Sequence, residues 1–149
     1  MTAQPFVVSP QERTQSLRVV GEHITVLASA AQTGSYEIFF QAGPVGSGPQ
    51  PHNHPWDEAF YVMRGKVAFG IGDRESLAVE GTLVQVPGGT THWFRYGRGG
   101  GEMLSMTSGE GASAFFTDVD RNVSPENPDL GKFIRIAESH GLRFPLPPR

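Results

Sequence analysis

Three of the five histidines in this 149-residue sequence lie beside glycine and proline, in two segments that could bind a metal ion. His52 and His54 are followed by Glu58, and His92 comes shortly after Pro87-Gly88-Gly89. Three imidazoles and one carboxylate can fill the protein side of a divalent metal site, and this set suits iron, manganese, cobalt, nickel, copper or zinc. The sequence therefore predicts one bound transition metal, whose identity the ligand types leave open.

The alternative is that these are surface residues without a metal, because two histidines in a proline-rich loop often lie on the surface and bind nothing. Residues two apart in a strand point the same way, which His52, His54 and Glu58 satisfy, although Pro51 and Pro55 make the segment irregular. The regular spacing of glycine and proline around the histidines is what favours the metal site.

Composition excludes several other classes of protein. The net charge is −3 and there are only two lysines, so no nucleic-acid interface is expected. Cysteine is absent, which rules out disulfides, thiolate metal sites and cysteine nucleophiles and fits a cytoplasmic location. No stretch approaches the ~18 apolar residues of a membrane span, and residues 1–10 lack the pattern of a signal peptide.

Short alternating segments separated by glycine and proline favour an all-β sandwich or barrel. The strands expected from alternation are 23–28, 36–41, 58–64, 66–70, 76–79, 82–86, 92–96, 102–107 and 114–116. We expect one domain over residues 1–149, with an N-terminal arm at 1–16 and the barrel at roughly 20–118.

The apolar period changes near the C-terminus. From Asp129 to His140 the apolar residues recur every three or four positions, as on one face of an amphipathic helix. Asn127 as N-cap, Pro128 at the first helical position and Gly141 as the stop predict a helix over roughly 128–140.

The residues that frame the histidines resemble the two motifs of the cupin family. The fixed positions of the first motif are Gly46, His52, His54, Glu58 and Gly65. Those of the second are Gly81, Pro87, Gly89, His92 and Tyr96, and only the last departs from the family pattern, which has asparagine there. That asparagine is not a metal ligand in the family.

The resemblance implies a double-stranded β-helix, a jelly-roll β-barrel of two antiparallel sheets with the metal inside. By the same resemblance the metal ligands are His52, His54, Glu58 and His92. Small cupins are often homodimers, and an arm such as Phe6 to Val8 could pair with a partner's sheet edge.

Within the family the chain most resembles single-domain cupins of the quercetin dioxygenase-like group. This implies a metal-dependent dioxygenase that brings O2 to a small aromatic or enolic substrate of flavonol or polyketide type. Glu58 would act as ligand and proton acceptor, and Tyr96 would donate a hydrogen bond to the substrate. Two alternatives stay open: a polyketide cyclase or isomerase that uses the metal as a Lewis acid, and a non-enzymatic barrel that binds or senses a small ligand.

An apolar, aromatic substrate pocket is expected beside the metal. Phe60 and Val62 share strand parity with Glu58, and Phe94 and Tyr96 share it with His92. A further strand is expected to contribute Tyr36, Ile38 and Phe40, or alternatively Phe39, with Met103 or Met106 beyond them. Each of these could instead be an ordinary residue of the barrel core.

Overall fold

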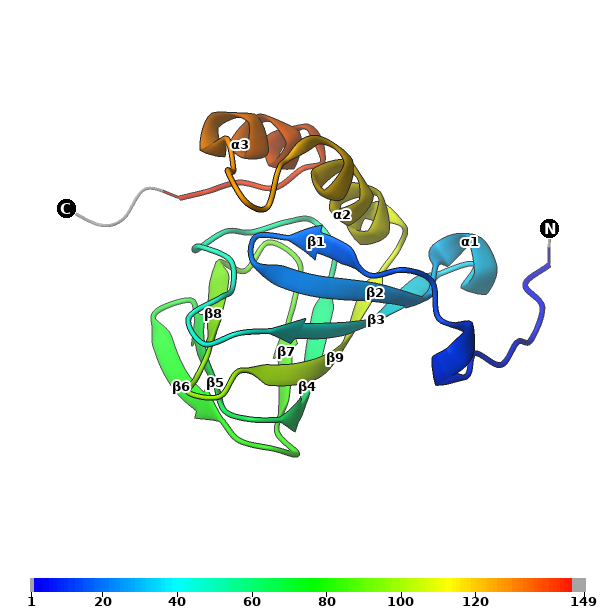
Figure 1. The fold of residues 1–149 in the computed structure, drawn as a ribbon, viewed down its shortest axis with the longest axis horizontal. Coiled ribbons are helices and arrows are strands. Elements are labelled where there is room, and N and C mark those ends of the chain that lie inside the picture. Colours follow the sequence, from blue (N-terminus) through cyan, green and yellow to red (C-terminus); the bar gives the residue numbers. More distant parts are fainter. Residues whose placement is uncertain (1, 146–149) are drawn as a thin grey trace.

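Two antiparallel sheets form the barrel of the computed structural model, which describes residues 2–145 (Figure 1). The strands are β1 (Leu17–Val19), β2 (Glu22–Ala28), β3 (Tyr36–Gly43), β4 (Glu58–Arg64), β5 (Val67–Ile71), β6 (Arg74–Ala78), β7 (Leu83–Val86), β8 (His92–Tyr96) and β9 (Gly101–Ser108). The larger sheet has the order β1-β2-β3-β9-β4-β7, and the smaller has the order β6-β5-β8. All pairings are antiparallel, which confirms the predicted all-β class.

Strands β4 and β8 begin at residues predicted to bind metal. In β4, Glu58, Phe60 and Val62 are buried while Tyr61 and Met63 are exposed. Such alternation is what a strand with one face toward a core requires, because successive side chains point to opposite sides. The observed bounds of β4 and β8 agree with the bounds predicted from the sequence.

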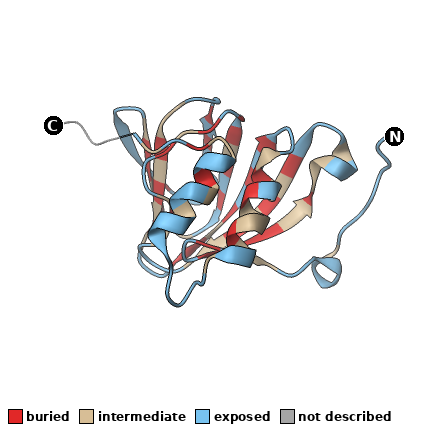
Figure 2. Ribbon diagram, turned by 90° about the horizontal axis from the view of Figure 1, so that it is seen from above, coloured by how far each residue is buried: buried red, intermediate tan, exposed pale blue. Residues whose placement is uncertain are grey.

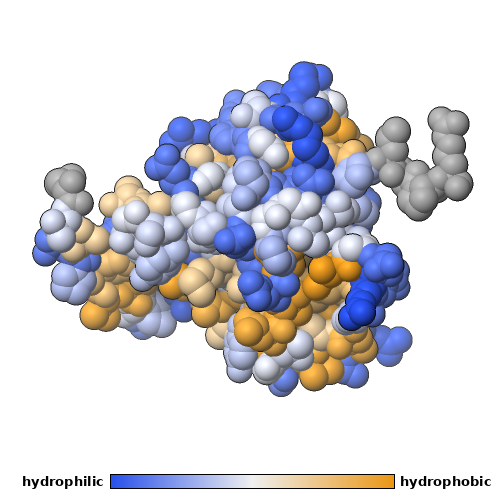
Figure 3. Space-filling model, turned by 180° about the vertical axis from the view of Figure 1, so that it is seen from behind, coloured by the Kyte–Doolittle hydropathy of each residue, from blue (hydrophilic) through white to orange (hydrophobic). Residues whose placement is uncertain are grey.

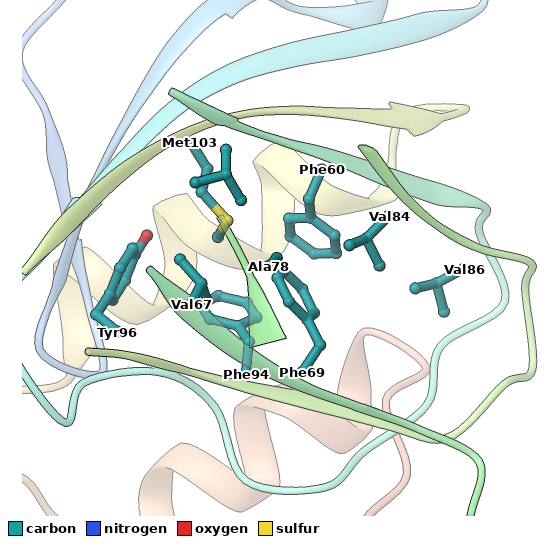
Figure 4. Close-up of a cluster of buried hydrophobic side chains, with 10 residues drawn as sticks. Phe60, Val67, Phe69, Ala78, Val84, Val86, Phe94, Tyr96 and Met103 are labelled. Atoms are coloured by element: carbon teal, nitrogen blue, oxygen red, sulfur yellow. The ribbon is translucent and has the colours of Figure 1, made fainter. Parts of the chain in front are cut away.

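Buried apolar side chains fill the space between the two sheets (Figure 4). The rings of Phe60, Phe69 and Phe94 lie 5.3–5.6 Å apart, at the offset or edge-on angles that aromatic pairs favour. Met103 and Tyr96 belong to the same cluster. The part of the barrel between the two sheets that holds these residues is therefore a packed core.

A second apolar cluster joins the larger sheet to two helices, α2 (Gly111–Asn122) and α3 (Leu130–Ser139). Figures 1 and 2 show both helices over the β1 side of the barrel, with exposed faces turned outward. The expected strand at 114–116 is wrong, because that segment is helical. Ala112, Phe115 and Val119 are its buried residues, and their spacing of three and four places them on one helical face.

The C-terminal helix forms as predicted but starts slightly later. Asp129, not Asn127, is the N-cap, and its side chain accepts a hydrogen bond from the Lys132 backbone N–H. Gly141 follows the helix with a φ of +92°. In the N-terminal arm, a 3-10 turn (Pro10–Glu12) precedes β1, and a short helix, α1 (Ala30–Thr33), lies between β2 and β3.

Two glycines of the predicted motifs differ in their surroundings. Gly65 has a φ of +84°, and a Cβ atom there would lie 2.3 Å from the Gly100 carbonyl oxygen. Gly89 has a φ of +83°, but nothing lies within 4 Å of such a Cβ. Both positions favour glycine for its left-handed backbone, and Gly65 also allows a close backbone approach.

Not all apolar residues are buried. Figure 3 shows hydrophobic residues on the surface of the barrel below the helices, and Leu77 and Leu83 are each more than 60% exposed. Within residues 2–145, none of the helices is both long enough and apolar enough to cross a membrane.

Candidate metal centre

The structure brings the three predicted histidines together. His52 and His54 lie on the segment before β4, and His92 begins β8. An isolated antiparallel bridge joins His52 to His92, with their backbone N–H and carbonyl groups bonded in both directions at 2.9 and 3.1 Å. One ligand atom from each of His52, His54 and His92 lies within 4.8 Å of the others, and all three side chains are buried.

All three imidazoles are oriented by backbone carbonyls. The Nδ1 atoms of His52, His54 and His92 lie 2.7–3.0 Å from the carbonyl oxygens of Gln50, Trp56 and Thr90, respectively. A carbonyl oxygen can only accept, so each Nδ1 carries the proton. Each Nε2 is then unprotonated, and its lone pair is available to bind a metal. Metal-binding histidines are typically held in this way.

Glu58 supplies a carboxylate beside two of these imidazoles. Its Oε1 lies 3.1 Å from Nε2 of His54 and 3.4 Å from Nε2 of His92. Burial alone would raise the pKa of Glu58, but the adjacent imidazoles of His54 and His92 outweigh it and lower the pKa to about 2. Burial, followed by the neighbouring His92, lowers the pKa of His52 to about 4. At neutral pH the site therefore presents an ionised carboxylate and a neutral His52, the forms that bind metals.

His54 provides the test of whether a metal fits. Its two ring nitrogens both face acceptors, the Trp56 carbonyl and Glu58, whereas a neutral imidazole has only one N–H. Nε2 of His92 is buried without a hydrogen-bond partner among the described residues. A cation between these Nε2 atoms and Glu58 would satisfy all of them, so the residues present fit a divalent metal.

Trp56 covers one side of the cluster. Its ring stacks on that of His54, with centroids 4.3 Å apart and planes 12° apart. Gly111, at the start of α2, packs against the same indole, since a Cβ there would lie 2.8 Å from it. The helix α2 thus holds in place the side chain that shields His54.

The histidine cluster opens into a cavity of about 1070 Å³. All four predicted ligands lie in its wall, and most of the remaining lining is apolar. Besides residues of β3, β8 and the segment before β4, the lining includes parts of β1, β2, α2, α3 and the segment after α3, among them Phe115, Val119, Phe133 and Phe144. This volume is slightly above the roughly 300–1,000 Å³ usual for small-molecule sites.

Comparison with known proteins places this geometry in a family. Residues 39–112 match the family model described as the cupin domain, and they contain all four predicted metal ligands. About half of the chain is thus a cupin domain. No curated protein matches the sequence significantly.

Several solved structures resemble the chain in fold. KdgF from Halomonas sp. is 16% identical with a TM-score of 0.64, over 70% of this chain and 94% of that one. A predicted oxalate decarboxylase from Thermotoga maritima is 18% identical with a TM-score of 0.63, over 69% and 98%. The polyketide cyclase RemF from Streptomyces resistomycificus is 18% identical with a TM-score of 0.61, over 70% and 80%. Together with the two antiparallel sheets, these likenesses confirm the double-stranded β-helix. At such low sequence identity they establish the fold and not the activity.

The residues predicted to bind substrate fall into three groups in this cupin. Phe94 lines the cavity. Phe60, Val62 and Tyr96 are buried in the barrel core and are absent from the cavity lining.

The third group differs from the expectation in its orientation. In β3 the buried residues are Glu37, Phe39 and Gln41, so Tyr36, Ile38 and Phe40 lie on the opposite face of the strand. Of β3, only Gln41 lines the cavity. Phe39, the alternative considered from the sequence, does point inward, where it packs against Phe116.

Tyr96 contacts a residue that sequence reasoning missed. Its hydroxyl donates a hydrogen bond of 2.8 Å to Oε1 of Glu22, in β2, and both side chains are buried. Burial, with the adjacent Glu22, raises the pKa of Tyr96 well above its ordinary value, so the hydroxyl keeps its proton. One signal could have identified Glu22, because it shares strand parity with the buried Ile24.

Proposed function

We propose that this cupin is an enzyme that binds one divalent transition metal through His52, His54, His92 and Glu58. Its substrate would be a small, largely apolar aromatic or enolic molecule of flavonol or polyketide type, and its reaction a dioxygenation. One observation supports this above others: a charged, metal-compatible cluster lies in the wall of a large cavity whose other walls are mainly apolar.

The bound metal would supply a Lewis-acid or redox centre in that wall. The chain's own contributions follow from the geometry. Glu58, which lies beside His54 in the wall of the cavity, is placed to take the proton of a substrate hydroxyl. Trp56 and Phe94 flank the cluster with aromatic surface that accepts a flat ring and excludes water.

A cyclase or isomerase is the second candidate, favoured by the size of the cavity. A space of about 1070 Å³ accommodates several fused rings, and RemF, which shares the fold, is a polyketide cyclase. In that case a Lewis acid would polarise a carbonyl group and no O2 would be consumed.

The first test is elemental analysis of protein purified without added metal or chelator. We expect about one equivalent of a transition metal in the wild type and its loss in His54→Ala. His23→Ala is the matched control, because His23 is exposed on β2 and lies outside the cluster. Failure of the wild type to hold metal even after reloading would contradict the metal site and favour a plain binding barrel.

Oxygen uptake separates the two reactions. The iron, manganese, cobalt and nickel forms would be mixed with flavonols, catechols and related enols, in air and under anaerobic conditions. O2 consumption with product formation supports the dioxygenase, and anaerobic turnover supports the cyclase or isomerase. Binding without any turnover would contradict an enzymatic function.

A further inference from the structure

Glu22 is an acidic side chain in the wall of the mainly apolar cavity. It lies at the start of β2, is 4% exposed, and lines the same space as the metal ligands. Burying a carboxyl group among apolar side chains costs free energy unless the group is paired or neutral. The burial of the Glu22 carboxyl group in this apolar wall therefore requires an explanation.

The hydrogen bonds of Glu22 use only one of its two oxygens. Oε1 accepts from the Tyr96 hydroxyl at 2.8 Å and from Nε2 of Gln41 at 3.2 Å. Within residues 2–145, no hydrogen bond to Oε2 is found. Tyr96 and Gln41 thus fix the carboxyl group by one oxygen and leave the other free in a residue that lines the cavity.

The surroundings of Glu22 favour its neutral form. Burial raises the pKa of Glu22 most, and the charge of Glu58 adds to this, while the hydrogen bonds from Tyr96 and Gln41 oppose it in part; the resulting pKa is about 8. These groups belong to β8, β3 and β4, the strands that face Glu22. A protonated carboxyl group is a hydrogen-bond donor as well as an acceptor.

We propose that Glu22 recognises a second oxygen atom of the substrate, by donating a hydrogen bond from Oε2 at a point of the cavity separate from the metal cluster. This inference rests on the proposed function, in which a first substrate oxygen faces His52, His54, His92 and Glu58. The ligand class is a flat, largely apolar molecule with two separated oxygens, of which the second is an acceptor such as a ketone, phenol or ether.

Specificity is the expected consequence. A buried polar group that loses its partner is left unsatisfied, so a site built around it discriminates against analogues that lack the matching oxygen. The competing explanation is that Glu22 only ties β2 to β8 through Tyr96. In that case Glu22 and Tyr96 variants would have the same effect on ligand binding.

The experiment measures binding to the zinc-loaded protein by fluorescence, since zinc permits binding without redox turnover. The probes are 3-hydroxyflavone and its 4′-methoxy and 7-methoxy derivatives, which add one acceptor at either end of the molecule. We expect the wild type to bind one methoxy derivative about 3–10-fold more tightly than the parent, the range of one hydrogen bond.

The variants decide between recognition and structure. Glu22→Leu should reduce the preference to about one, whereas Glu22→Gln should keep it because the amide also donates. Tyr96→Phe should keep it as well, since Tyr96 bonds only to Oε1. The preference is the ratio of the affinities for the methoxy probe and the parent. A general change in the cavity that affects both affinities equally therefore cancels.

A second measurement applies if Glu22→Leu does not fold. As the pH rises through about 8, the wild type should lose affinity for the preferred methoxy probe relative to Glu22→Gln, and the probe's own ionisation cancels in this comparison. Equal affinities of the wild type for all three probes, or a preference retained in Glu22→Leu, would overturn the inference alone. Absence of zinc binding, or of binding by any probe, would overturn the proposed function and the inference with it.

Discussion

Oε1 of Glu58 and Nε2 of His54 lie 3.1 Å apart, four residues from each other in the sequence and both buried. The turn at Pro55 and Trp56 brings them together, and the carbonyl of Trp56 fixes the opposite ring nitrogen of His54. The same short segment therefore supplies a ligand, its orienting acceptor and a carboxylate. This arrangement makes Glu58 the most informative residue to change.

Glu58→Gln keeps the size of the side chain and removes its charge. We expect the metal dissociation constant to rise by more than the roughly 10–100-fold typical for loss of an outer-shell partner, because a direct anionic ligand is lost. Competition with a chromophoric chelator measures the change. Glu75→Gln, exposed on β6, is the control and should match the wild type. Unchanged affinity in Glu58→Gln would show that Glu58 is not a ligand.

Glu22 should make stability depend on pH. Its pKa is about 8 in the folded protein and near the ordinary 4.5 when unfolded. Between these values the folded state keeps a proton that the unfolded state loses, so the stability from Glu22 is fully present below about pH 4.5. It is lost as the pH rises to about 8, by up to about 1.4 kcal/mol per pH unit.

Glu22→Gln removes this dependence. Its free energy of unfolding should therefore increase relative to the wild type as the pH rises from 5 to 8, and the difference should level off above 8. Urea unfolding of both proteins in the same metal state measures the difference at each pH. Parallel curves for the two proteins across this range would contradict the assignment.

Two motif glycines provide a matched pair for the packing of the barrel. Gly65→Ala and Gly89→Ala both place a side chain at a φ near +84°, at a cost of about 1–2 kcal/mol. Gly65→Ala should destabilise the protein by a further ~1–3 kcal/mol, because its Cβ would meet the Gly100 carbonyl. Guanidinium unfolding of the two variants gives the difference. Equal losses would mean that the chain relaxes around Gly65 without cost.

The sequence predicted the metal cluster better than the cavity, and the two strands that start at its ligands show why. In β4 and β8 buried and less buried residues alternate, so period and bounds follow from the pattern. In β3 both faces carry aromatic residues, and the more apolar face was expected inside. The structure instead buries Glu37, whose carboxylate accepts hydrogen bonds from the backbone N–H groups of Ala30 and Ser113. Strand parity alone cannot reveal partners that distant.

The helical part of the cavity was missed for a related reason. Residues 114–116 look like a short strand in isolation, and only the longer spacing of Ala112, Phe115 and Val119 indicates a helix. Phe115 and Val119 line the same cavity as the histidine cluster, so its shape depends on long-range packing. Short motifs carry no information about that packing.

The cavity described above is assembled from a central metal-binding stretch of the chain and from residues on both sides of it, in β1 and β2 and after residue 112. The part that would hold the metal lies within residues 39–112, whereas Phe115, Val119, Phe133 and Phe144, which complete the walls, lie beyond them. A substitution in the later stretch can reshape the space offered to a ligand without changing any histidine. Reactivity and selectivity can therefore evolve separately in this protein, and exchanging the C-terminal stretch is a direct route to redesigning what it accepts.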